Sequence, residues 1–238
     1  MNLKENIAAV NARIAAAALR AGRDPNEITL VAATKVQTSE TIRAAIAAGI
    51  TACGENRVQE MAAHLDNDAY AGARLHFIGH LQTNKVKQVV GRVDLVESVD
   101  SLRLLEAIGK RAAELEMVQD ILLEVNIAGE ESKGGIAPAE LPALAEKAME
   151  LPHIRLRGLM CIPPVVVSVG SNRKFFAQTR QLFVDIRTKI SDNDTDIDCL
   201  SMGMSGDFED AVEEGATLVR VGTALFGQRP PVVGIHQG

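Results

Sequence analysis

The stretch Ile28-Thr29-Leu30-Val31-Ala32-Ala33-Thr34-Lys35 decides the fold. It follows the turn-like Asp24-Pro25-Asn26 and consists mostly of apolar and β-branched residues, as expected of a strand buried on both faces. Its last residue is a lysine, whose ammonium group is costly to bury without a partner. Either Lys35 reaches solvent where the strand ends, as most lysines do, or it is an amine nucleophile held at the mouth of a barrel or sheet. The chemistry of the residues that surround Lys35 distinguishes between these two interpretations.

Strand-like stretches recur along the whole chain, and a helical pattern follows each of them. An amphipathic helix ended by Gly22 comes first, and Ser101 is the expected cap of a later helix. The predicted strands cover residues 28–35, 50–54, 75–79, 93–99, 120–127, 155–162, 196–202 and 217–221, and the helices between them include residues 82–90, 138–149, 173–190 and 207–214. Strict alternation predicts an α/β fold with a parallel sheet, and eight units fit a (β/α)8 TIM-type barrel with an extra N-terminal helix. An open doubly wound sheet is the alternative, but no Gly-x-Gly-x-x-Gly follows a strand.

Length and composition narrow the class of protein. No linker divides the 238 residues, so we expect a single domain over residues 1–238. A net charge of −6 argues against a general nucleic-acid binder, and no stretch has the length of a membrane span. The first residues open into a helix without a signal core, and the three cysteines are widely spaced in apolar stretches. We therefore expect a cytoplasmic protein with reduced cysteines and no metal site.

Polar and small residues collect at the predicted strand ends, which is the rim where barrels carry their functional groups. Glu97 is as readily a helix cap as a site residue, and His76, His80 and Met160 are more typical of structural positions. The loops after the seventh and eighth strands are less ordinary. Their glycines and hydroxyls, Ser201, Gly203, Ser205, Gly206, Gly222 and Thr223, suit a phosphate. A phosphate site facing a strand-end lysine favours pyridoxal 5′-phosphate (PLP), whose aldehyde an amine can bind.

With these residues, the sequence resembles the pyridoxal phosphate homeostasis proteins (the YggS/PROSC-like group), which have the fold of the alanine racemase N-terminal barrel. The matching segments are 31–35, 54–60, 76–85, 124–126, 158–160, 200–207 and 220–223. The resemblance implies that Lys35 forms a Schiff base with PLP and that Ser201, Ser205, Gly222 and Thr223 hold the phosphate. It further implies that Met160 lies near the ring, that Arg220 lies near the pyridine nitrogen, and that Asn56 lies just behind the residues that contact the cofactor. One segment, the apolar loop at residues 163–170, departs from the charged loop expected of the family.

The resemblance also sets the expected function. Family members are mostly described as holding PLP and acting in intracellular vitamin B6 homeostasis, without established turnover. We therefore expect a monomeric carrier that passes PLP to apo forms of PLP enzymes, with no catalytic residue and Lys133 as an accessory amine. Two alternatives stay open: a PLP-dependent amino-acid racemase or decarboxylase, and a barrel enzyme whose Lys35 binds a sugar phosphate.

The racemase alternative is disfavoured by the missing acid. The related racemases take a tyrosine from a second domain, whereas this sequence ends soon after its last predicted strand. Its one tyrosine, Tyr70, is expected at the far end of the helix that follows the second strand, on the opposite face of the barrel and so far from Lys35.

Overall fold

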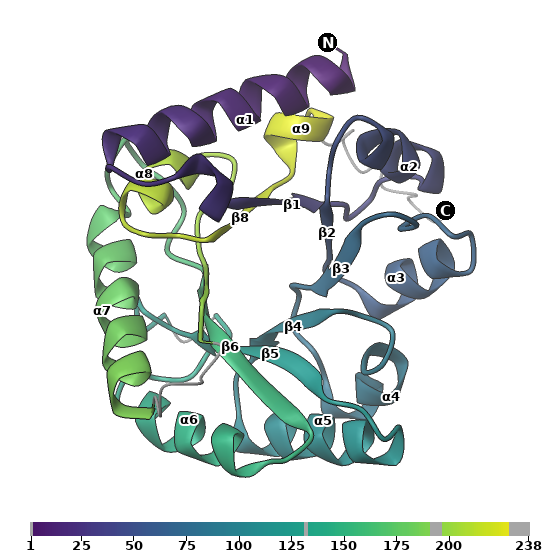
Figure 1. The fold of residues 1–238 in the computed structure, drawn as a ribbon, viewed down its shortest axis with the longest axis vertical. Coiled ribbons are helices and arrows are strands. Elements are labelled where there is room, and N and C mark those ends of the chain that lie inside the picture. The colour runs from purple at the N-terminus through teal and green to yellow at the C-terminus, as the bar shows by residue number, and fades with distance from the viewer. Residues whose placement is uncertain (1, 131–132, 191–196, 229–238) are drawn as a thin grey trace, which may run out of the picture.

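The structure is a computed structural model that describes residues 2–130, 133–190 and 197–228. Eight parallel strands close into a barrel in chain order, and helices surround it (Figure 1). The strands are β1 (Thr29–Ala33), β2 (Ala52–Glu55), β3 (Arg74–Phe77), β4 (Leu95–Val99), β5 (Gln119–Val125), β6 (Ile154–Cys161), β7 (Cys199–Ser201) and β8 (Leu218–Val221). The predicted (β/α)8 barrel is confirmed.

The helices follow the strands as the alternation predicts. They are α1 (Leu3–Arg20), α2 (Ser39–Ala47), α3 (Val58–Leu65), α4 (Val86–Val89), α5 (Leu102–Glu114), α6 (Leu141–Glu150), α7 (Arg173–Ile190), α8 (Phe208–Glu213) and α9 (Thr223–Phe226), with 3-10 turns at Pro25–Glu27 and Thr83–Lys85. The extra helix α1 packs across α8 and α9 (Figure 1). In the described part of the chain, no helix has both the length and the apolar character needed to cross a membrane.

Two helix boundaries differ from the sequence prediction. Helix α6 begins at Leu141 and not at Pro138, because Ile136 still forms backbone hydrogen bonds with Glu124 and Asn126. Residues 137–140 then form the turn into the helix. The predicted helix 82–90 begins as the 3-10 turn Thr83–Lys85 before α4. The predicted cap is confirmed, since the Ser101 side chain accepts a hydrogen bond from Leu104 N–H at the start of α5.

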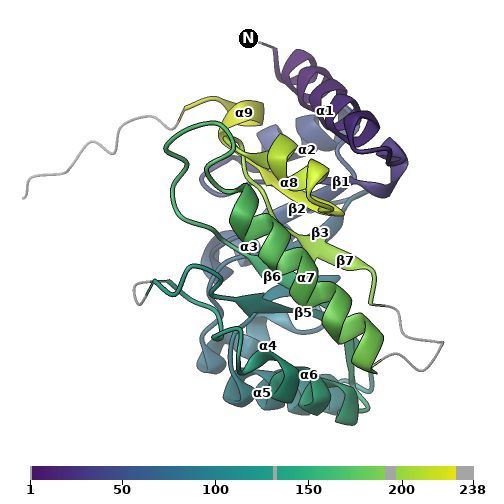
Figure 2. The same cartoon turned by 90° about the vertical axis from the view of Figure 1, so that its left-hand side faces the viewer.

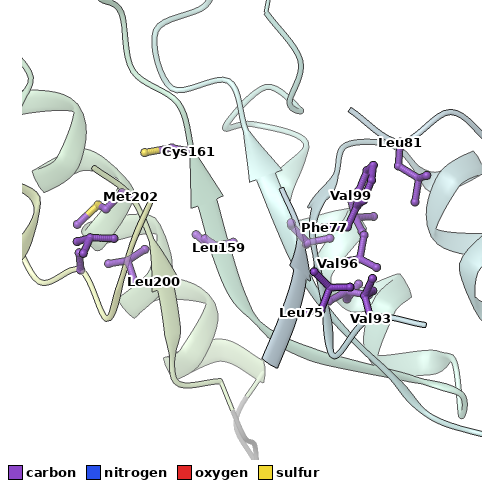
Figure 3. Close-up of a cluster of buried hydrophobic side chains, with 14 of the residues drawn as sticks. Leu75, Phe77, Leu81, Val93, Val96, Val99, Leu159, Cys161, Leu200 and Met202 are labelled. Atoms are coloured by element: carbon purple, nitrogen blue, oxygen red, sulfur yellow. The ribbon is translucent and has the colours of Figure 1, made fainter. Parts of the chain in front are cut away.

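The core has two layers, because successive side chains of a strand point to opposite faces. The larger layer lies between the sheet and the helices, and Figure 3 shows part of it, including Phe77, Val96 and Leu159. The smaller layer fills the barrel interior with Val31, Ala52, Leu95, Leu122, Met160 and Leu218. Side chains that point inward beyond this apolar layer, towards the carboxyl ends of the strands, are placed to form a site.

Candidate functional site

A cavity of about 480 Å³ opens at the carboxyl ends of the strands. This volume is within the range of small-molecule sites, about 300–1,000 Å³. Six of the eight predicted site residues line it: Lys35, Asn56, Ser205, Arg220, Gly222 and Thr223. Residues from β1, β2, β7 and β8 thus meet at the rim where barrels carry their function.

A larger cavity of about 740 Å³ lies at the opposite, amino ends of the strands. Two of the three arginines that line it are held in ion pairs, since Arg155 pairs with Asp120 and Arg157 pairs with Asp120 and Asp198. In TIM-type barrels this face contributes to stability, so size alone does not make the larger cavity the functional site.

Lys35 stands in the turn that follows β1 and is half-buried. Strand β1 ends at Ala33, two residues earlier than predicted, but Thr34 N–H still bonds Gly54 O at 3.0 Å. The backbone then reverses at Val36, whose φ of 59° lies in the left-handed region that β-branched residues rarely adopt. This reversal leaves Lys35 on the wall of the cavity.

A buried carboxyl group lies behind this turn. Glu55 is fully buried, and its Oε1 accepts hydrogen bonds from Thr34 Oγ1 at 2.6 Å and from Tyr70 Oη at 3.0 Å. Burial raises the pKa of Glu55, although both hydrogen bonds oppose that shift. Tyr70, which we expected to lie far from Lys35, donates to Glu55, the carboxyl group that also accepts from Thr34, the residue before Lys35. Tyr70 is nevertheless not among the residues that line the cavity.

Asn56 brings an unsatisfied acceptor to the cavity. Its buried Oδ1 has no hydrogen-bond partner among the described residues. Its backbone packs directly on Gly79, where an added Cβ would lie 2.1 Å from Asn56 O. A donor on a bound molecule would satisfy Asn56 Oδ1, whereas Gly79 has no room for a side chain.

The loops after β7 and β8 meet at Ser205. Its Oγ accepts hydrogen bonds from the backbone N–H groups of Gly222 at 3.2 Å and Ala224 at 3.3 Å. Two N–H donors that converge on one oxygen form a small anion-binding concavity. Thr223 lies between them on the cavity wall. The loops after β7 and β8, which the sequence predicts to bind phosphate, are therefore close together at the cavity.

The guanidinium of Arg220 forms part of the cavity wall and is otherwise buried. One nitrogen donates to Ser201 Oγ at 2.5 Å, and another donates to Cys161 O at 2.8 Å. A guanidinium has five N–H donors, so three remain after these two hydrogen bonds. Ser201 and Cys161 thus fix the guanidinium on the side away from the cavity, and its other N–H groups can donate to a ligand.

Two predicted site residues do not reach the cavity. Ser201 is fully buried, and its hydroxyl is used by Arg220 and by Glu97, whose Oε2 lies 2.5 Å away. Met160 is also fully buried, in the apolar layer of the barrel interior. Their predicted contacts with phosphate and ring have no support from this placement, because the seventh and sixth strands direct both side chains inward, below the cavity.

Three contributors were missed or weighed too lightly from the sequence. Glu97 does not cap a helix; it points into the barrel interior and binds His76 Nδ1 at 2.7 Å. Gly79 carries no chemical group, so only its packing against Asn56 reveals it. Glu60 accepts a hydrogen bond from Val36 N–H, a contact between segments that sequence spacing does not show. Within the described ranges, no group of three or more His, Cys, Asp or Glu residues could hold a metal ion.

The apolar loop at residues 163–170 forms one wall of the cavity through Val165 and Val166. Figure 2 shows the chain between β6 and α7 running up beside α9. Lys133 Nζ donates to Pro163 O at 2.9 Å, and Asn172 Nδ2 donates to Pro164 O at 3.0 Å. The loop is therefore tied at its first residues, and Lys133 itself is engaged with Glu130 as well as with the loop.

Fold and site together define a TIM-type barrel whose carboxyl-end cavity is lined by a lysine, an arginine and the residues of the loops after β7 and β8. The family model described as "Alanine racemase, N-terminal domain" matches residues 2–230. The chain belongs to this family and, within it, to the pyridoxal phosphate homeostasis proteins, as its curated relatives show.

The relatives cover almost the whole chain. The pyridoxal phosphate homeostasis protein of Aquifex aeolicus is 44% identical over 96% of this chain and 99% of its own length. The protein of that name from Escherichia coli K12 is 40% identical over 96% of this chain and 97% of its own. Among solved structures, PipY of Synechococcus elongatus with PLP bound is 34% identical, with a TM-score of 0.81 over 95% of this chain and all of PipY.

Similarity to a racemase is limited to the fold. An alanine racemase of Clostridium difficile 630 superposes with a TM-score of 0.73 at 14% identity. This chain covers 57% of the racemase, so the racemase is a distant relative of the barrel alone.

Proposed function

We propose that this protein binds PLP in the carboxyl-end cavity and acts as a holder of the cofactor in vitamin B6 homeostasis. The observation that carries the proposal is the meeting of Lys35 with Ser205, Gly222, Thr223 and Arg220 in one cavity. An amine for the aldehyde and N–H and hydroxyl donors for the phosphate are the two groups that PLP requires of a protein.

Each residue has a distinct part in this proposal. Lys35 supplies the amine that binds the cofactor covalently. Ser205, Thr223 and the backbone of Gly222 hold the phosphate, and Arg220 directs its remaining donors at the ring. Asn56 Oδ1, which lacks a donor among the described residues, accepts a hydrogen bond from the cofactor. PLP itself supplies an electrophilic aldehyde and an electron-withdrawing ring.

The proposal favours holding over turnover because of Arg220. A permanently charged guanidinium beside the pyridine nitrogen disfavours protonation of that nitrogen. An unprotonated ring withdraws electrons weakly, so the bound cofactor is poorly suited to stabilise a carbanion. The cavity wall also lacks a tyrosine, since Tyr70 lies behind it. We extend the proposal to delivery of PLP to apo forms of PLP enzymes, by a monomer in the cytoplasm.

Two measurements test this proposal. Titration of the purified protein with PLP should produce a visible absorption band at a 1:1 ratio, which a sugar-phosphate enzyme would not show. Incubation of the loaded protein with L-alanine in deuterated water should give no α-deuteration beyond one equivalent. Many turnovers of L- to D-alanine per site would support the racemase alternative instead.

A further inference from the structure

A chain of hydrogen bonds crosses the barrel interior directly below the cavity. Arg220 on β8 donates to Ser201 Oγ on β7, and Ser201 Oγ lies 2.5 Å from Glu97 Oε2 on β4. Glu97 Oε1 lies 2.7 Å from His76 Nδ1 on β3. All four side chains are buried, with Ser201 and Glu97 fully enclosed.

The surroundings of Glu97 favour its ionised form although the side chain is fully buried. Burial by itself raises the pKa of its carboxyl, but the hydrogen bonds and charges of His76, Arg220 and Ser201 together hold that pKa below its usual value. An ionised carboxylate only accepts hydrogen bonds. Ser201 and His76 must therefore both donate to Glu97, and a lone pair of Ser201 is left facing Arg220. The charge of Glu97 thus sets the direction of every bond in the chain.

Arg220 needs such a partner, because a buried guanidinium stays charged and is costly without compensation. Glu97 Oε2 lies 3.9 Å from Arg220 Nη1. The other buried carboxyl near Arg220 is Glu124 on β5, whose pKa is raised to about 7 by burial and by the charge of Asp100. Burial also keeps the Cys161 thiol of β6 neutral, by raising its pKa to about 11. Of these three buried groups, Glu97 is therefore the one whose surroundings favour a negative charge beside Arg220.

We propose that Glu97 is the counter-charge of Arg220 and that, through Ser201, it fixes the orientation in which the guanidinium faces the cofactor. Glu97 is then a positioning residue. It also lowers the free-energy cost of burying Arg220, because the ion pair carries no net charge. The bound cofactor is then next to a guanidinium whose positive charge is partly neutralised by Glu97, which lies on the side away from the cavity. The effect on the cofactor rests on the proposed function, whereas the pairing itself does not.

The pairing is tested first without cofactor, by a double-mutant cycle at pH 6. Glu97→Gln leaves Arg220 without its counter-charge, Arg220→Met leaves Glu97 with His76 and Ser201 alone, and the double variant removes both charges of the pair. We expect the double variant to melt at a higher temperature than either single variant, or to fold where they do not. In the matched control cycle, Glu124→Gln with Arg220→Met, the losses should add, because Glu124 is neutral at that pH. Additive losses in the Glu97 cycle would overturn the pairing.

The effect on the cofactor is tested by titrating the absorption band of the PLP-loaded protein with pH. Glu97→Gln keeps an acceptor for Ser201 but removes the negative charge, so the midpoint should fall by on the order of one pH unit. Ser201→Ala keeps the charge and should shift the midpoint by less. The difference in midpoint between wild type and Glu97→Gln must persist when Glu124→Gln is added to both proteins, because Glu124 titrates in this range. An unchanged midpoint in Glu97→Gln, or equal shifts in both variants, would overturn the inference. A wild-type protein without any band would contradict the proposed function, and the cofactor-free cycle would still decide the pairing.

Discussion

The Glu60 carboxylate in the first turn of α3 accepts a hydrogen bond from the backbone N–H of Val36 at 3.0 Å. Val36 follows Lys35 directly and has a positive φ of 59°. Such a conformation costs a β-branched residue roughly 1–3 kcal/mol and persists only where its surroundings hold it. Helix α3 thus stabilises the turn that places the lysine on the cavity wall.

We predict from this contact that Glu60→Ala weakens PLP binding about fivefold, because losing one hydrogen bond costs on the order of 1 kcal/mol. Glu60→Gln is the matched control, since its amide oxygen can still accept from Val36. Absorbance titration with PLP measures both affinities. Equal losses in the two variants would show that the charge of Glu60, and not its hydrogen bond, matters.

Gly79 leads to a prediction about packing. A methyl group there would collide with the backbone of Asn56, so Gly79→Ala should lower the free energy of unfolding by about 1–3 kcal/mol or more and weaken PLP binding together with it. Gly109→Ala is the control, because its Cβ would lie at least 3.4 Å from its neighbours and alanine favours the helix α5. Denaturant melts and PLP titrations check both. A Gly79→Ala protein with unchanged affinity would remove Asn56 from the site.

The phosphate should dominate binding. Charge-assisted hydrogen bonds contribute about 1.5–3 kcal/mol each, so pyridoxal without phosphate should bind at least 100-fold more weakly than PLP. Ser205→Ala and Thr223→Ala should weaken PLP binding but leave pyridoxal binding nearly unchanged. Competition titrations with both compounds measure this selectivity. Similar affinities for PLP and pyridoxal would mean that the loops after β7 and β8 bind something else.

Glu124 should make the stability of the fold depend on pH. Its pKa rises from 4.5 to about 7 on folding, mainly through burial and secondarily through Asp100. A carboxyl with a raised pKa stabilises the fold fully below its unfolded pKa, and this contribution is lost as the pH rises through about 7. We predict that Glu124→Gln is more stable than wild type at pH 8 by up to roughly 3 kcal/mol, and that the difference shrinks towards pH 5. The melting temperatures of wild type and Glu124→Gln, plotted against pH, should converge towards pH 5. A constant difference between them would contradict the raised pKa of Glu124.

The order of elements was predictable from the sequence because it depends on local patterns. Strand runs, the Ser101 cap and Gly22 at the end of α1 all act within a few residues. The same patterns placed Lys35 and the loops after β7 and β8 at one rim, since parallel strands share their carboxyl ends.

Side-chain direction was less predictable. Whether the inward-pointing Ser201 reaches the cavity or lies below it depends on how far β7 extends, and Ser201 is still part of that strand. Tyr70 reaches Glu55 because α3 ends at Leu65 and the chain turns back at Asp68, whose φ is 49°. Neither feature has a sequence signal strong enough to read in advance.

The proposed function requires Lys35 to carry PLP covalently. Borohydride reduction of the loaded protein, followed by proteolysis and mass-spectrometric mapping, tests it most directly. We expect one pyridoxyl group per chain, on Lys35, and its loss in Lys35→Arg but not in Lys85→Arg. A pyridoxyl group found mainly on Lys85 or Lys133 would contradict it.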